Sequence, residues 1–161
     1  MKKTFLIAAL FIGVLLFAGG YAESRHHKPI GLHAPAIALE EADSVINLDR
    51  MRGDYVLLTF WSSTDALSRQ AANLYTAWER RNPEADLKMI GINFDDSQAL
   101  FREIVRRDSL VNDQQFHISG ERAKELSDKY GLDQGFGSVL INPEGRIVAY
   151  NPSPDELNTL I

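Results

Sequence analysis

The stretch YVLLTFWSSTDALSR, residues 55–69, decides the fold, because an apolar segment leads there through small polar residues into a helix. Residues 55–61 are β-branched, apolar or aromatic without alternation, which is typical of a strand buried on both faces. A helix is predicted from about Asp65 to Arg81, ended by Asn82-Pro83. Its expected buried face consists of Leu67, Ala71, Leu74, Tyr75 and Trp78. A strand that ends in Ser, Thr and Asp at a helix start has the layout of an active site.

Strand and helix patterns alternate through the rest of the chain. Short extended segments are expected around Ile37 and Val45, and a second buried strand over residues 87–93. A helix follows, with Leu100, Phe101, Ile104 and Val105 as its buried stripe. The remaining predictions are a short strand near Phe116, a helix over about 121–129, a hairpin around Asn142-Pro143-Glu144-Gly145, and a last helix with Ser153 and Glu156 as its capping box. This order predicts an α/β fold with a central mixed sheet flanked by helices on both faces.

The first 22 residues have the layout of a secretory signal peptide. Lys2 and Lys3 precede an unbroken apolar run over residues 5–18, and Gly20-Tyr21-Ala22 gives a small-x-small ending before Glu23. An uncleaved N-terminal anchor is the alternative, although the run is shorter than the ~20 residues that a spanning helix needs. Both interpretations place the body of the protein outside the inner membrane, in the periplasm or beyond. Residues 23–30 read as a flexible stalk, and residues 31–161 as one folded domain.

Composition excludes several classes of function. The chain has no cysteine, so it has no disulfide, no thiolate nucleophile and no cysteine metal cluster. The net charge is −5, and it becomes −7 without Lys2 and Lys3, with 15 basic against 22 acidic residues. An acidic chain without a basic cluster is a poor candidate for binding nucleic acid or an anionic membrane. His26, His27 and His33 lack Asp or Glu at ligand spacing, so no metal site or cofactor is expected.

Four stretches in order carry a family likeness: GLHAPAIAL (31–39), LDRMRGDYVLLTFWSS (48–63), YGLDQGFGSVLIN (130–142) and INPEGRIVAY (141–150). From about Gly31 to its end the chain resembles the bacterial exported thioredoxin-like proteins of the TlpA/ResA and AhpC/TSA type. The resemblance implies a thioredoxin-like fold. It also implies a thiol–disulfide oxidoreductase site at the helix start, with a Cys-x-x-Cys motif and a cis-proline opposite it.

All three defining positions of that site depart from the family pattern. Phe60-Trp61 sets the register, which places Asp65 and Ser68 at the two cysteine positions and Phe136, followed by Gly137, at the cis-proline position. Thiol–disulfide exchange requires a thiolate that attacks sulfur. Redox or peroxidase activity of this chain is therefore rejected on chemical grounds. Because a non-proline cis bond costs about 3 kcal/mol or more, Phe136 is expected in a trans peptide.

Simple structural roles are the first interpretation of the altered site. Asp65 or Thr64 is expected to cap the helix, and Ser68 to be a solvated hydroxyl in its first turn. Asp95 and Asp96 are likewise expected to cap the following helix rather than to form an acid–base or metal pair.

Two functional interpretations remain open, binding and catalysis. The first is a non-catalytic binding or accessory module of the cell envelope, with a protein or peptide partner. Its surface would be formed by the helix start and the loop opposite: Trp61, Ser62, Ser63, Thr64, Asp65, Ser68, Phe136 and Gly137. The alternative is an enzyme with non-thiol chemistry at Asp65 and Ser68. A serine nucleophile needs a base such as His within hydrogen-bond reach, and only His33 and His117 lie in the folded body.

Overall fold

The structure is a computed structural model that describes residues 30–41 and 44–161. The predicted signal peptide or anchor (1–22) and nearly all of the predicted stalk (23–30) lie outside the described residues. No helix within the described ranges is long and apolar enough to cross a membrane.

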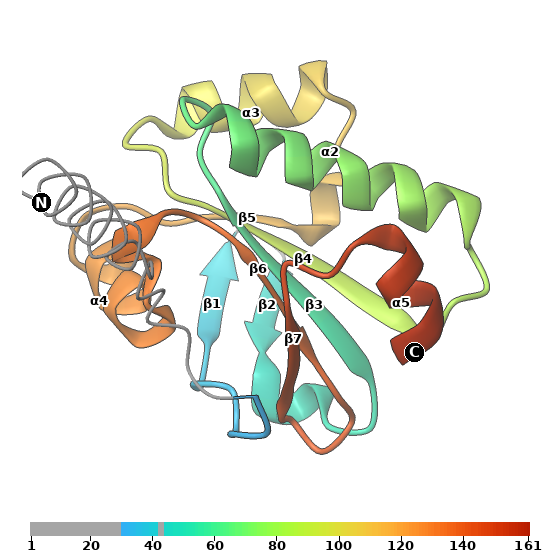
Figure 1. The fold of residues 1–161 in the computed structure, drawn as a ribbon. Coiled ribbons are helices and arrows are strands. Elements are labelled where there is room, and N and C mark those ends of the chain that lie inside the picture. Colours follow the sequence, from blue (N-terminus) through green and yellow to red (C-terminus); the bar gives the residue numbers. More distant parts are fainter. Residues whose placement is uncertain (1–29, 42–43) are drawn as a thin grey trace, which may run out of the picture.

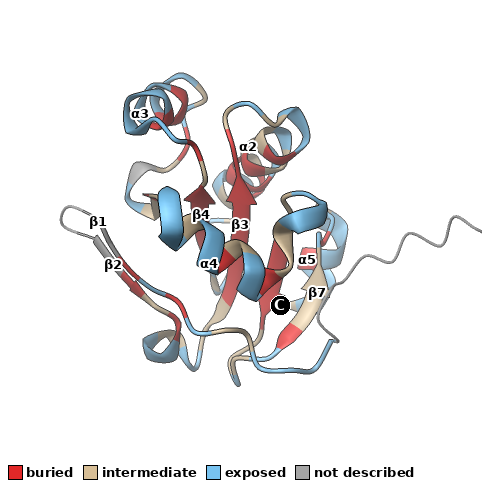
Figure 2. Ribbon diagram, turned by 90° about the vertical axis from the view of Figure 1, so that its left-hand side faces the viewer, coloured by how far each residue is buried: buried red, intermediate tan, exposed pale blue. Residues whose placement is uncertain are grey.

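A mixed five-stranded sheet forms the centre of the domain, as predicted (Figure 1). Its spatial order is β5 (Gln115–His117), β4 (Leu87–Asn93), β3 (Tyr55–Trp61), β6 (Ser138–Ile141) and β7 (Ile147–Tyr150). The strands β3, β4 and β5 are parallel. Strand β6 runs antiparallel to β3, and β7 runs antiparallel to β6 and so in the same direction as β3. Strands β3 and β4 are red along most of their length in Figure 2, because helices or the N-terminal hairpin cover both faces.

The two faces of the sheet are covered by different elements. Leu57 and Trp61 of β3 face the side packed by α2 (Ala66–Arg81), α3 (Gln98–Arg107) and α5 (Pro154–Leu160). Leu58 and Phe60 face the opposite side, packed by α4 (Gly120–Tyr130) and the hairpin of β1 (Ala38–Glu41) and β2 (Ser44–Asn47). This alternation follows from the two-residue period of a strand. Three short 3₁₀ segments, Leu48–Met51 (η1), Asn112–Gln114 (η2) and Leu132–Gln134 (η3), complete the described elements.

Local sequence signals fix the ends of several elements. The β6–β7 hairpin turns at Asn142–Gly145, where the Gly145 N–H donates to the Asn142 carbonyl at 2.7 Å and Gly145 has a φ of 73°. Glycine adopts that φ without the penalty of a side chain. Ser153 and Glu156 form the predicted capping box at the start of α5. The sequence signals for these ends are therefore confirmed.

The predicted buried faces of two helices are partly wrong. Leu67 and Leu74 of α2 are 78% and 42% exposed, and Leu100 of α3 is 39% exposed. In α2, the small residues Ser68, Ala72 and Thr76 recur at a spacing of four and lie against the domain, because they let the helix approach closely. Leu67 and Leu74 lie to the side of this row. The buried residues of α2 are Ser68, Ala72, Tyr75, Thr76 and Trp78.

Candidate functional site

The candidate site lies at one edge of the sheet, where β3 and β4 both end. Trp61 is level with Asn93 in the parallel register, so the segments after these two strands emerge side by side. The loop before β6 reaches the same edge, since the Phe60 N–H donates to the Gly137 carbonyl at 2.9 Å. The structure therefore brings together the helix start, the end of β4 and the loop at residues 135–137.

Asp65 is the N-cap of α2, as predicted. Its Oδ1 accepts a hydrogen bond from the Ser68 N–H at 2.7 Å. The prediction that Ser68 is a solvated hydroxyl is wrong, because the residue is only 5% exposed. Its Oγ accepts from the Ser62 N–H and donates to the Asp65 carbonyl, both at 3.3 Å. Asp65 and Ser68 thus hold each other in place within the turn.

Asp95 forms the centre of the site, and its predicted role as a helix cap is wrong. Ser97, not Asp95, caps α3, with its side chain accepting from the Leu100 N–H. The Asp95 residue is 5% exposed, and its Oδ1 accepts from the Ser62 Oγ at 2.7 Å and from the Ser63 N–H at 2.8 Å. Its Oδ2 accepts from the Ser63 Oγ and from the Asn93 Nδ2. A buried carboxylate is thus fully coordinated by neutral donors.

These donors determine the electrostatics of the Asp95 carboxylate. Burial raises its pKa, but the hydrogen bonds from Ser63, Ser62 and Asn93 outweigh burial and leave the pKa below its ordinary value. The single Ser62 hydroxyl proton points to Asp95, so the Thr64 hydroxyl donates to Ser62 Oγ at 3.0 Å. The network therefore carries the negative charge of Asp95, and the Ser62 hydroxyl donates towards this buried carboxylate.

The two histidines of the described domain, His33 and His117, lie in different parts of the molecule. His117 Nε2 lies 2.7 Å from the Asp95 main-chain oxygen, and since a carbonyl only accepts, this nitrogen carries a proton. The His117 ring also stacks on Phe101 at a centroid distance of 5.4 Å. His33 forms an isolated antiparallel β-bridge with Arg146 near the hairpin turn, at the far end of the sheet. Within residues 30–41 and 44–161, no group of three His, Asp or Glu residues is placed to hold a metal ion.

Phe136 lies between the core and the surface. Its ring is 5.3 Å from the Phe94 ring, which in turn meets the buried Phe60 ring at 6.1 Å. The residue is half-buried, and the described backbone contains no cis peptide, so the expected trans bond at Phe136 is confirmed. Phe136 therefore packs against the core and remains partly accessible.

Three members of the predicted binding surface, Trp61, Ser62 and Ser68, are not on the surface. Trp61 is fully buried, with its Nε1 donating to the Gln115 Oε1 at 3.1 Å, and Ser62 is 6% exposed. Trp61 ends the central strand β3, and the side chains of α2 and α3 cover it. The accessible part of this edge consists of Ser63, Thr64, Asp65, Leu67, Phe136 and Gly137.

Sequence reasoning missed Asp95 as the centre of the network and Leu67 as an exposed residue. The signal for Asp95 was present, because Asn93 and Asp95 come at the end of the second buried strand. The carboxyl ends of adjacent parallel strands meet at one edge, where Ser62 and Ser63 were already expected. Leu67 gave no such signal, because its spacing fits the apolar face of the helix.

The fold and the altered helix start define a thioredoxin-like protein without the thiol pair. The chain belongs to the AhpC/TSA family, whose model matches residues 30–150. A search of curated proteins gives no match.

Solved structures agree with this assignment. A thioredoxin-like protein from Parabacteroides distasonis is 31% identical, with a TM-score of 0.71, over 83% of this chain and 95% of that one. The thioredoxin domain of a thiol-disulfide oxidoreductase from Bacteroides vulgatus is 23% identical, with a TM-score of 0.71, over 83% and 96%. A putative thiol:disulfide interchange protein DsbE from Chlorobium tepidum is 19% identical, with a TM-score of 0.65, over 82% and 92%. The last two likenesses show the shared fold.

Proposed function

We propose that this protein is an exported, non-catalytic binding or accessory module of the bacterial cell envelope. It would bind a protein or peptide partner at the edge where α2 begins, through Thr64, Asp65, Leu67 and Phe136. The chain has no cysteine, so it lacks the thiolate that a thiol–disulfide oxidoreductase of its family needs.

One observation carries this proposal: the polar groups of the site are paired inward, whereas its apolar groups face outward. Asp95, Ser62 and Ser68 are buried. The Ser62 Oγ donates to Asp95, and the Ser62 N–H donates to the Ser68 Oγ. Leu67, on the first turn of α2, is 78% exposed, and Phe136 is accessible on one side. Exposed apolar side chains beside a rigid polar scaffold favour the binding of another surface.

Non-thiol catalysis at Asp65 and Ser68 receives no support from these contacts. The Ser68 Oγ donates to a main-chain carbonyl rather than to a base. Ser63 does donate to a carboxylate, that of Asp95, but a carboxylate with a lowered pKa is a weak base. A binding role accounts for the same residues without an activated nucleophile.

Export rests on the N-terminal sequence, with Lys2 and Lys3 ahead of the apolar run and the small-x-small ending at residues 20–22. Cell fractionation of the full chain, followed by mass measurement of the mature protein, tests this part. A mature protein that begins at Glu23 in the periplasmic fraction supports export with cleavage. Full-length protein in the cytoplasmic fraction contradicts export.

Site-specific photo-crosslinking tests the binding surface. A photoreactive residue at Leu67 is expected to capture one defined envelope protein, and the same residue at Leu74 is the matched control. Leu74 is exposed on the same helix, two turns further along. Capture at Leu67 should be lost in Phe136→Ala and in Asp65→Lys. Equal capture at Leu67 and Leu74, or capture that survives both substitutions, contradicts the proposal.

A further inference from the structure

The edge strand β5 covers only part of its neighbour β4. Strand β5 has three residues and pairs with Gly91, Ile92 and Asn93. Residues 87–90 of β4 have β3 on one side, and within the described residues no strand pairs with them on the other. The chain ahead of β5 leaves the sheet as the 3₁₀ segment η2. Among residues 30–41 and 44–161, nothing pairs with the outer side of this half of β4, which is therefore an open sheet edge.

The direction of the main-chain groups on this edge follows from two hydrogen bonds. The Phe94 N–H donates to the Trp61 carbonyl beyond β3, and the Asn93 carbonyl accepts from the Ile118 N–H beyond β5, both at 2.9 Å. Main-chain groups of successive residues in a strand point to opposite neighbours. The N–H and C=O groups of Leu87 and Met89 therefore point, like those of Asn93, towards the open edge.

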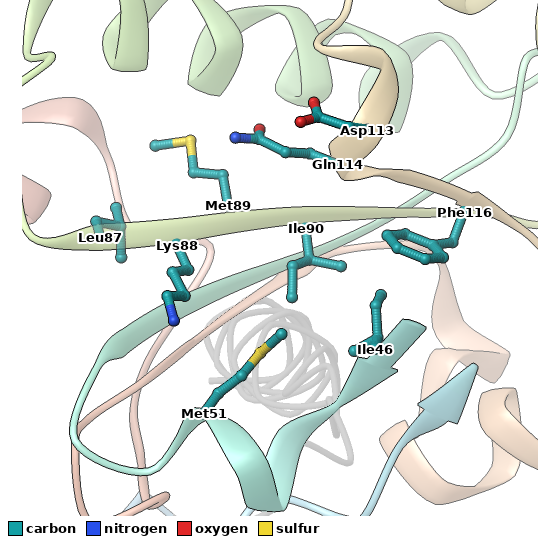
Figure 3. A pocket seen from close by; sticks show the side chains of 9 residues that line it. All are labelled: Ile46, Met51, Leu87, Lys88, Met89, Ile90, Asp113, Gln114 and Phe116. Carbon is teal, nitrogen blue, oxygen red and sulfur yellow. The ribbon is translucent and has the colours of Figure 1, made fainter. Parts of the chain in front are cut away.

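A hollow of about 380 Å³ lies along this open edge. Figure 3 shows β4 crossing it, with Ile90 directed towards Ile46 and Met51 on one side of the strand. On the other side of the strand, Met89 is directed towards Asp113 and Gln114. An added strand would thus place alternate side chains against an apolar wall and beside a carboxylate.

The charges around the hollow favour a basic occupant. The cation on β4, Lys88, is already paired, with its Nζ 2.5 Å from Asp54 Oδ2. Asp113 on the wall of the hollow and Asp86 just before β4 are both exposed, and the structure gives neither an ion pair with a described residue. A second copy of this chain, with its net charge of −5, would bring like charges together.

We propose that the open edge of β4 binds an extended segment of another protein, in which apolar and basic residues alternate. The segment would add a strand beside Leu87 and Met89 through main-chain hydrogen bonds, with its apolar side chains against Ile46 and Met51 and a basic side chain beside Asp113. Strand addition to an exposed edge is a general mode of peptide recognition. This surface is separate from the one formed by Leu67 and Phe136, and it does not depend on the function proposed above.

The test uses the full chain and a capped hexapeptide of alternating Lys and Val as the probe. Binding is measured by fluorescence anisotropy, and hydrogen exchange of the backbone amides is followed by NMR. Addition of the probe should slow exchange at Leu87 and Met89. A probe with N-methylated valines, which keeps its side chains but loses main-chain donors, should bind about tenfold more weakly.

Variants of the protein separate the two components of the interaction. Asp113→Lys should weaken binding severalfold, whereas Asp128→Lys, which makes the same change on the exposed face of α4, should not. Leu87→Pro removes an edge N–H and should weaken binding, whereas Leu87→Val keeps that N–H and most of the affinity.

Three outcomes would overturn the proposal. One is equal affinity of the plain and N-methylated probes, or no binding of either. Another is slowed exchange around Leu67 instead of Leu87 and Met89, which would assign the peptide to the other surface. The third is a dimer in sedimentation experiments whose Leu87 and Met89 amides are protected without the probe, since the occupant would then be a second copy.

Discussion

The two halves of β4 differ in how fully their polar groups are hydrogen-bonded. At its C-terminal end, Asn93 and the following Asp95 belong to a buried network in which Ser62 and Ser63 satisfy the carboxylate. In its N-terminal half, the main-chain groups of Leu87 point to an edge that no described strand covers. One strand thus leads into a buried, hydrogen-bonded carboxylate at one end and has an edge without a described partner strand at the other.

The two halves of β4 therefore meet separate structural demands. At the closed end, hydrogen bonds from Ser62, Ser63 and Asn93 hold the Asp95 carboxylate in place. The open half is protected from non-specific pairing by an exposed lysine, Lys88, and by its short length, two common devices of natural edge strands. The comparison predicts that substitutions in the two halves have effects of different size and kind.

Proline at neighbouring positions of β4 tests the comparison with the largest expected effect. Lys88→Pro removes an N–H directed to β3 and should cost about 3 kcal/mol or more. Leu87→Pro removes an N–H directed to the open edge and should cost about 1 kcal/mol, mainly from lost apolar contact. Urea unfolding measures both. Equal losses would show that Leu87 already has a main-chain partner.

Asp95→Asn should have the next largest effect, because it tests the closed end. The substituted amide keeps the shape of the side chain but replaces an acceptor oxygen with a donor that faces Ser62, Ser63 or Asn93. The free energy of unfolding should fall by about 2–3 kcal/mol. Asp96→Asn is the control, since Asp96 is the exposed neighbour and should change stability by less than about 0.5 kcal/mol.

Strong local patterns allowed most of the fold to be predicted from the sequence. Residues 87–93 form β4 with the predicted bounds, because a short apolar run between polar residues is buried most readily as a strand of the central sheet. The helix after Asp65 and the capping box at Ser153 followed from side-chain hydrogen bonds that act within a few residues.

The environment of the site could not be read in the same way, because it depends on tertiary contacts. Asp95 looks like a cap in sequence, but its carboxylate turns back to Ser62 and Ser63, more than 30 residues away. Leu67 fits the apolar spacing of α2 but lies on the outer side, since Ser68 and Ala72 take the place nearest the domain. Which side of an amphipathic helix packs inward is set by its neighbours, and the spacing alone does not fix it.

The pH dependence of stability gives a smaller and more specific test of the closed end. The folded-state pKa of Asp95 is lowered, so its contribution is fully present above the unfolded value of about 3.9 and is lost as pH falls towards the folded value. The stability difference between wild type and Asp95→Asn should therefore shrink as pH falls below about 4. Asp108, whose pKa the hydrogen bond from Arg69 lowers, is common to both proteins and cancels. A stability difference that stays constant with pH would mean that the charge of the Asp95 carboxylate does not contribute to stability.

Asp65→Ala should have the smallest effect, because it removes one hydrogen bond at the rim of the closed end. The Ser68 N–H would lose its acceptor at the start of α2, which should cost about 1 kcal/mol in urea unfolding. Asp65→Ser, which can still cap the helix, should restore most of that loss. A loss well above that, not restored by serine, would instead show that the Asp65 charge supports the Asp95 network. The two halves of β4 would then differ by more than local hydrogen bonding.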